Sequence, residues 1–256
     1  MDAIVIAGGI PLPEEPLYPY TQGRSKALLD VVGRPMVQWV LDALSKAAKV
    51  DHVVIIGLNE KNALQCSKPT FYLQSEGHML ANMIAGVNKV VEINPQAEYV
   101  LIVSSDIPGI TGEMVDWLVT QTEKTRADVY YGVIPREIME KRYPDSRRTW
   151  THLKDMDVCG ADINVVHVSM ATEHLDTWEA LIGNRKSAFK QAAVIGYGTL
   201  LQFLFRRISI ADALRHIHER IGIQAKDVIW PWAEAGMDVD KPNQLEIMRE
   251  DLSKKK

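Results

Sequence analysis

The first half of the chain alternates short apolar runs with segments of helical period, and this alternation restricts its fold more than any other feature. The apolar runs contain no charged residue and end at glycine or at a short polar stretch; they cover residues 3–7, 53–56 and 99–103. Such runs are typical of strands that are buried on both faces. Amphipathic segments follow them and cover residues 36–47, 79–91 and 111–119. We therefore predict a three-layer α/β/α sandwich with a mostly parallel sheet.

The second half of the chain has a less regular pattern. Residues 136–148 are charged and irregular, and we expect a surface excursion there, whereas residues 163–168 form a predicted strand. The pattern is helical throughout 171–222, which predicts a helical elaboration that serves as a cap, an oligomer interface or an insertion. An apolar face at 200–208 suits the core or a contact in a homodimer.

Helix ends and the last residues complete the predicted organisation. Ser209 and Asp212 have the spacing of a capping box, which predicts a helix start, and Gly222 is a typical helix stop. The Lys-rich residues 253–256 predict a flexible tail. The sequence contains no internal repeat and no low-complexity segment, so we expect one domain over residues 1–256.

Composition and charge exclude several classes of protein. The 256 residues are 46% hydrophobic and 24% charged, which suits a globular core and excludes a disordered chain. A net charge of −4 provides no broad basic face, so we expect no nucleic-acid partner. Cys66 and Cys159 lack metal-ligand spacing and indicate a reducing compartment. Because no apolar run is long enough to span a bilayer and no cleavable signal opens the chain, we expect a cytoplasmic protein without a membrane span.

A glycine pair and a lysine form the first candidate site. Gly8 and Gly9 follow the apolar run 3–7, so the backbone there can approach a ligand closely and offer N–H groups to phosphate oxygens. Lys26, beyond a proline-rich loop, can supply the positive charge that phosphates require. Taken alone, each feature has an ordinary explanation, a tight turn and a solvated lysine.

The combination of these residues is more specific. Ala7-Gly-Gly9, followed after a loop by Lys26-Ala-Leu-Leu-Asp-Val-Val-Gly-Arg-Pro-Met36, resembles the opening of the MobA-like and sugar-nucleotide pyrophosphorylase superfamily of nucleotidyltransferases. The resemblance implies the nucleotide-diphospho-sugar transferase fold, which is GT-A-like and Rossmann-like. Members carry A-G-G-x-G-x-R, whereas here a long proline-rich loop at 10–23 replaces the G-x-R. Arg24 is the candidate replacement for the missing arginine.

Two aspartates match metal ligands of this superfamily. Asp106 follows the apolar run 99–103, so its carboxylate is expected at the carboxyl edge of the sheet, where open α/β sheets place their sites. The resemblance implies that Asp106 and Asp240 hold Mg²⁺ against the nucleotide phosphates, since a hard cation prefers oxygen ligands. Asp238 is the alternative second ligand. A purely structural role would also explain each of the two main candidates, because Asp106 can begin a turn before Pro108 and Asp240 can cap a final helix.

Other matches to the superfamily are less specific. Gly77 lies where relatives place a loop that reads the nucleobase, and Asn164 lies where relatives place residues that face the acceptor substrate. The resemblance also assigns Ala7 and Ser105 to nucleotide binding. A helix-entry turn explains Gly77 about equally well, and an ordinary strand start explains Asn164.

The resemblance implies a Mg²⁺-dependent nucleotidyl transfer. A phosphate or hydroxyl group of a small-molecule acceptor attacks the α-phosphorus of an NTP, and pyrophosphate leaves. The expected catalytic residues are Lys26 and Arg24, because a cation stabilises the negative charge that develops on the transferring group. CTP, GTP and UTP all suit the sequence, as do molybdopterin, sugar phosphate and polyol phosphate acceptors.

Three other functions remain open. A glycosyltransferase of the same fold would use an NDP-sugar and a D-x-D pair, and Asp155-Met-Asp157 and Asp238-Val-Asp240 have this spacing. A dinucleotide-binding reductase is disfavoured, because no G-x-G-x-x-G follows the first apolar run. A catalytically degenerate nucleotide-binding protein would explain the missing G-x-R. Release of pyrophosphate, rather than of NDP, distinguishes nucleotidyl transfer from glycosyl transfer.

Overall fold

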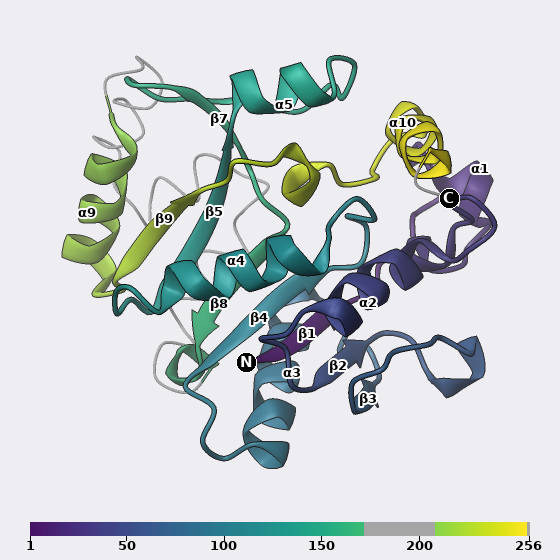
Figure 1. The fold of residues 1–256 in the computed structure, drawn as a ribbon, viewed down its shortest axis with the longest axis horizontal. Helices are drawn as coiled ribbons and strands as arrows, with labels where there is room; N and C mark the ends of the chain where they lie inside the picture. The colour runs from purple at the N-terminus through teal and green to yellow at the C-terminus, as the bar shows by residue number, and fades with distance from the viewer. Residues whose placement is uncertain (172–207, 255–256) are drawn as a thin grey trace.

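The computed structural model describes residues 1–171 and 208–254, and Figure 1 shows its ribbon. The described strands form one nine-stranded sheet in the order β3-β2-β1-β4-β8-β5-β7-β6, with β9 beside β5. The strands are β1 Asp2–Ile6, β2 Val53–Ile56, β3 Thr70–Leu73, β4 Tyr99–Ser104, β5 Val129–Pro135, β6 Thr151–His152, β7 Asp157–Gly160, β8 Ile163–His167 and β9 Ala225–Ile229. The helices are α1 Tyr18–Thr21, α2 Met36–Lys46, α3 Met79–Ile93, α4 Gly112–Thr122, α5 Arg136–Arg142, α9 Ile210–Ile221 and α10 Pro242–Ser253.

Helices cover both faces of the central strands. Successive side chains of a strand point to opposite faces, so the apolar run of β1 contributes to two cores. Ala3 and Val5 are buried in one cluster with α2 and α4, whereas Ile4 is buried in a second cluster with α3. Figure 1 shows these helices beside the central strands. The predicted three-layer α/β/α sandwich is therefore confirmed.

The sheet is parallel throughout its first part only. Strands β3, β2, β1 and β4 run parallel to one another, and β9 runs parallel to β5. In contrast, β8 pairs antiparallel with β4 and β5, and β7 pairs antiparallel with β5 and β6. The parallel arrangement predicted from the first half of the chain is confirmed for β3, β2, β1 and β4, and beyond β4 the sheet is mixed. A parallel neighbour needs a long crossover, whereas short connections join β6, β7 and β8.

Side-chain caps fix the starts of two helices where the sequence predicts them. Thr111 Oγ1 accepts the Met114 N–H at 3.4 Å and begins α4, and Ser209 Oγ accepts the Asp212 N–H at 3.1 Å and begins α9. Gly222 ends α9 with a φ of 75°. These boundaries follow from local hydrogen bonds, which is why the sequence predicts them.

Other boundaries differ from the prediction. Residues 136–142 form α5 rather than an irregular excursion, and the pair between Arg136 Nε and Glu140 Oε1 at 2.8 Å spans one helical turn. Lys241, not Asp240, is the N-cap of α10. This helix continues to Ser253, the first residue of the predicted tail, and residues 255–256 lie outside the described part of the chain.

Most of the helical elaboration predicted at 171–222 lies outside the described residues. The apolar face predicted at 200–208 also lies outside them, except for Ile208. That residue is fully buried and belongs to a cluster with Val133 and Leu153. Over 1–171 and 208–254, no helix is both long enough and apolar enough to cross a bilayer.

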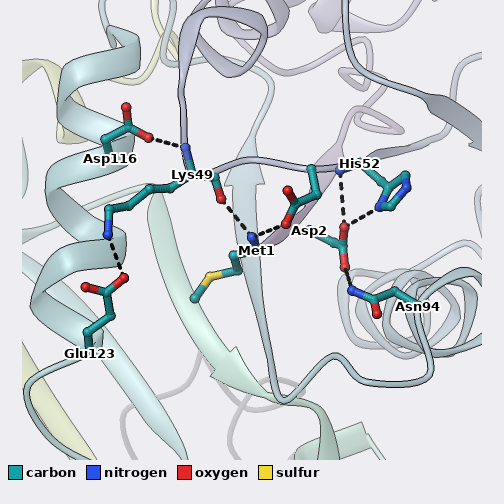
Figure 2. Close-up of polar contacts among 8 residues, drawn as sticks. Met1, Asp2, Lys49, His52, Asn94, Asp116 and Glu123 are labelled. Carbon is teal, nitrogen blue, oxygen red and sulfur yellow. Dashed lines mark hydrogen bonds and ion pairs between the residues drawn. The ribbon is translucent and has the colours of Figure 1, made fainter.

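A network of polar contacts fixes the amino edge of the sheet (Figure 2). The buried Asp2 carboxylate accepts the His52 backbone N–H at 3.2 Å and contacts the His52 ring Nδ1 at 2.7 Å. Asn94 Nδ2 donates to its other oxygen at 2.7 Å, and nearby Lys49 Nζ pairs with Glu123 Oε1 at 2.6 Å. These contacts join the start of β1 to the segment before β2 and to the end of α3. The opposite, carboxyl edge of the same strands carries the candidate site.

Candidate active site

A cavity of about 420 Å³ lies at the carboxyl edge of β1 and β4. Open α/β sheets bind their ligands at this edge, because the loops that follow the strands converge there. The cavity is lined by most of the site residues predicted from the sequence, namely Gly8, Gly9, Lys26, Gly77, Ser105, Asp106, Asn164 and Asp240.

The turn that follows β1 is packed too closely to hold a side chain. A Cβ on Gly8 would lie 2.9 Å from Ser75 Oγ. Gly57 has a φ of +92°, and a Cβ there would lie 2.2 Å from the Gly8 Cα. Position 57 therefore requires glycine, whereas a side chain at position 8 would have to displace Ser75; the backbone of Gly8 and Gly9 borders the cavity directly.

Lys26 is held in place by its neighbours in the chain. It begins a 3₁₀ turn, Lys26–Leu28, and its backbone N–H donates to Gly9 O at 3.0 Å. Ser25 Oγ donates to Ala7 O at 2.7 Å and accepts the Ala27 N–H at 3.3 Å. The return of the chain after the proline-rich loop is thus tied to the turn after β1, which aims the lysine at the cavity.

Three charged groups meet at the cavity floor. Lys26 Nζ lies 2.5 Å from Asp106 Oδ2 and 2.5 Å from Asp240 Oδ1. Ser104 Oγ donates to the other oxygen of Asp106 at 2.5 Å, and Asp106 O accepts the Val239 N–H at 2.9 Å. The end of β4 and the segment before α10 are therefore joined by backbone as well as by charge.

Charge and burial shift the pKa values of these groups. Burial acts to lower the pKa of Lys26, but the charges of Asp106 and Asp240 outweigh it and raise that pKa above its ordinary value. Burial acts to raise the pKa of Asp240, but Lys26 outweighs it and holds the pKa below its ordinary value. Lys26 is therefore an ammonium and Asp240 a carboxylate at neutral pH.

The same two carboxylates suit a divalent cation. Both turn an oxygen toward a single cationic atom, and carboxylate oxygens are the donors that Mg²⁺ prefers. No group of three or more His, Cys, Asp or Glu side chains is arranged to hold a metal within the part of the chain that the structure describes. A bound Mg²⁺ would thus take its remaining ligands from nucleotide phosphates and water, as Mg²⁺ commonly does.

Asp238 faces a different partner from Asp240. Its Oδ1 contacts Nη1 of Arg148, and Nη2 of the same arginine lies 3.6 Å from Asp162 Oδ2. Only 14% of the Arg148 side chain is exposed. Asp238 thus pairs with a buried guanidinium, whereas Asp240 shares the Lys26 ammonium with Asp106.

Asp162 is a cavity residue that the sequence reasoning missed. Burial, and then the negative charge of Asp106, raise the pKa of its carboxyl to about 7, although Arg148 opposes the shift. The string Gly160-Ala-Asp-Ile-Asn164 contains the one sequence feature that indicates this position. Asp162 directly precedes β8, which begins at Ile163 beside the end of β4 and therefore beside the cavity. Arg148 has no comparable signal, because it lies in an irregular segment.

Two predicted residues, Ala7 and Arg24, lie away from the cavity lining, and the amide of a third, Asn164, is bonded to backbone groups. Ala7 is buried and does not line the cavity; its carbonyl holds Ser25. Arg24 Nε donates to Thr21 O at 3.3 Å, and its side chain is also absent from the cavity lining. Asn164 does line the cavity, but its amide accepts the Gly132 N–H at 2.8 Å and donates to Ala161 O at 3.1 Å.

A second cavity, of about 450 Å³, shares Gly9, Lys26 and Asp240 with the first. It is lined by the proline-rich loop, including Ile10 and Leu17, and by Lys241. Lys26 and Asp240 line both cavities and form part of the wall between them. The long loop that replaces G-x-R thus borders the site.

The other D-x-D pair, Asp155 and Asp157, does not line the cavity. His152 Nδ1 lies 2.7 Å from one oxygen of Asp157, and Arg136 Nη1 lies 3.4 Å from the other. Asp157 is therefore engaged in contacts beside β6 and α5.

Solved structures of other proteins share this fold. A hypothetical transferase from Thermus thermophilus is 29% identical, with a TM-score of 0.83 over 95% of this chain and 98% of that one. A CMP:2-keto-3-deoxy-manno-octonic acid synthetase solved with CTP shares the fold at 16% identity, with a TM-score of 0.57 over 100% of this chain and 99% of that one. So does 4-diphosphocytidyl-2C-methyl-D-erythritol synthase from Anaerococcus prevotii, at 13% identity, with a TM-score of 0.57 over 98% of this chain and 95% of that one.

The family itself is shown by the sequence. The MobA-like NTP transferase domain matches residues 20–229, which is most of the chain. The match begins before Lys26 and includes Asp106. This chain belongs to the MobA-like NTP transferase family and is a nucleotidyltransferase.

Proposed function

We propose that this protein transfers a nucleoside monophosphate from an NTP to a small-molecule acceptor in a Mg²⁺-dependent reaction. The meeting of Lys26, Asp106 and Asp240 carries the proposal. It joins a cationic group to two oxygen donors, beside a glycine turn whose backbone borders the cavity. A triphosphate needs such a combination, because its charge must be matched by cations and N–H donors.

The proposed reaction is an in-line displacement at the α-phosphorus. An acceptor oxygen forms the new P–O bond, while the bond to the bridging oxygen breaks and pyrophosphate leaves with the electron pair. Lys26 stabilises the charge that develops on the transferring group. Asp106 and Asp240 would hold Mg²⁺, which neutralises phosphate charge when bound. Arg24 is retained as a second cationic candidate, although its Nε is bonded to the loop at Thr21.

Nucleotide binding is proposed along the edge of the sheet. Gly8 and Gly9, positioned by Ala7, would receive the phosphates through their backbone, and Ser105 lies beside them at the end of β4. Gly77 is proposed to lie against the nucleobase, on the side of the cavity formed by β3 and α3. CTP is the first nucleotide to test, because the synthetase with the same fold was solved with CTP; GTP and UTP follow.

The acceptor is proposed to bind at the opposite side of the cavity, beside Asn164 and Asp162. Because both amide atoms of Asn164 are bonded to backbone groups, this residue would shape the acceptor pocket by holding β5 and the turn before β8. Sugar phosphates, polyol phosphates and molybdopterin form the acceptor panel.

The experiment that tests this function has two steps. The first step is a thermal-shift screen of the four NTPs with Mg²⁺. An NTP that binds should raise the melting temperature of the protein, because a ligand that binds the folded state stabilises it by mass action. Assays of the acceptor panel with α-labelled NTP should then show label transfer together with pyrophosphate release. Release of NDP from an NDP-sugar would instead indicate a glycosyltransferase. Nucleotide binding without turnover across the panel would indicate a degenerate nucleotide-binding protein.

A further inference from the structure

A buried asparagine borders the cavity at the first turns of α3. Asn82 is 5% exposed, although asparagine is a polar residue that is usually found at the surface. Its side chain is not needed to cap the helix, because His78 Nδ1 accepts the Ala81 N–H at 3.3 Å and takes that role. The burial of Asn82 therefore calls for another explanation.

The side chain of Asn82 holds the loop between β3 and α3. Its Oδ1 accepts the Glu76 N–H at 2.7 Å, and its Nδ2 donates to Ser75 Oγ at 3.3 Å. Ser75 Oγ in turn accepts the Gly77 N–H at 3.3 Å. One amide thus fixes three consecutive residues that are otherwise exposed at the cavity mouth.

The inner end of this loop has an additional support. Ser75 packs against Gly8 so closely that a Cβ on that glycine would meet Ser75 Oγ at 2.9 Å. The outer end lacks such packing, since a Cβ on Gly77 would meet nothing within 4 Å. Asn82 consequently holds Glu76 directly and Gly77 only through Ser75 Oγ, while Ser75 is also held by the turn after β1.

We propose that Asn82 is a positioning residue that sets the base selectivity of the nucleotide site. This inference rests on the proposed function and on placing the nucleobase at residues 75–77. Bases differ in the pattern of donors and acceptors on their edges, so a loop can distinguish them only if its own polar groups stay fixed. Asn82 acts on this loop through its hydrogen bonds to Ser75 and Glu76.

The test measures dissociation constants for the four NTPs and for inorganic triphosphate, each with Mg²⁺, by calorimetry. Asn82→Ala is compared with Asn82→Asp, which keeps an oxygen for the Glu76 N–H, and with Asn88→Ala, an exposed asparagine on the same helix. In Asn82→Ala we expect the preference for the best NTP over the worst to fall about tenfold, which corresponds to about 1.4 kcal/mol. Inorganic triphosphate affinity should change less than twofold.

The remaining outcomes separate this inference from the proposed function. Asn82→Asp should recover most of the selectivity, and Asn88→Ala should match the wild type. An equal loss of affinity for all NTPs and for inorganic triphosphate would overturn the positioning role, as would unchanged selectivity in Asn82→Ala. A wild-type protein that binds NTPs without base preference would also overturn it. A wild-type protein that binds no NTP would instead overturn the proposed function.

Discussion

Lys26 Nζ lies 2.5 Å from Asp106 Oδ2 and joins the chain after the proline-rich loop to the end of β4. Asp240 completes the contact from the segment before α10. Three segments that are distant in the sequence thus meet in one cluster of charged side chains. The single ammonium offsets only part of the repulsion between two carboxylates, so the proposed Mg²⁺ and the backbone N–H groups would have to supply the rest of the attraction for a triphosphate.

Loss of the Lys26 ammonium should abolish turnover. In Lys26→Ala, we expect the rate of pyrophosphate release to fall by about 100-fold or more, because charge on the transferring group loses its stabilising cation. Circular dichroism with Mg²⁺ present should show an unchanged fold. Lys49→Ala, which removes an exposed ion pair with Glu123 at the amino edge, is the matched control and should keep wild-type turnover. Full activity of Lys26→Ala would contradict its assigned role.

The metal assignment predicts different results for neighbouring aspartates. Asp106→Asn and Asp240→Asn should each raise the Mg²⁺ concentration that half-saturates NTP-dependent stabilisation, by about tenfold or more, because each would remove a charged ligand. Asp238→Asn should change this concentration much less, since Asp238 is engaged by Arg148. Thermal-shift titrations of Mg²⁺ at fixed NTP, starting from EDTA-treated protein, provide the measurement. The reverse order for Asp238 and Asp240 would identify Asp238 as the ligand.

Asp162 should make stability depend on pH. Its pKa is raised from 3.8 to about 7, by burial first and then by Asp106. The folded state therefore binds this proton more tightly than the unfolded state, and the resulting stabilisation is complete below about pH 4 and lost as pH rises through about 7. Asp162→Asn cannot ionise, so it should be more stable than the wild type above pH 7, by about 1–2 kcal/mol after solvent screening.

Urea unfolding in EDTA at pH 4, 6 and 8 measures this difference. We expect the two proteins to be nearly equal at pH 4 and to separate as the pH rises. An advantage of Asp162→Asn that is the same at every pH would show that the raised pKa is not its cause.

The buried Asp2 carboxylate should contribute strongly to stability. The substitution Asp2→Ala removes the carboxylate that accepts hydrogen bonds from the His52 backbone N–H and from Asn94 Nδ2, so both donors lose this acceptor (Figure 2). We expect the free energy of unfolding to fall by about 3 kcal/mol. Asp51→Ala, which removes an exposed carboxylate from the same edge, should cost about 1 kcal/mol or less. Equal losses in the two variants, measured by urea unfolding, would refute the role of burial.

Gly57 should be required for both folding and nucleotide binding. Gly57→Ala places a methyl group 2.2 Å from the Gly8 Cα, so we expect a loss of about 3 kcal/mol or more and weaker NTP binding as the turn shifts. Gly23 also has a positive φ, of +80°, but a Cβ there meets nothing within 4 Å. Gly23→Ala should therefore cost only the backbone strain, about 1 kcal/mol. Thermal unfolding and calorimetry with NTP distinguish the two effects.

The sequence by itself determined the central strands and helices and the residues that gather at one edge. Buried strands such as Val53–Ile56 and caps such as Thr111 depend on local periodicity and local hydrogen bonds, so a single sequence contains them. It also placed Asp106 at a strand end, and the parallel order of β1 and β4 brings such ends together.

Only the tertiary structure decided the rest of the site. Because β8 pairs antiparallel with β4, Asp162 lies beside the end of β4. Asp238 contacts Arg148, which distinguishes Asp238 from Asp240. Asn82 looks like an ordinary helix residue until its amide is seen to hold the loop beside Gly8. These relationships depend on pairings between residues that are distant in the sequence, and no local pattern encodes such pairings.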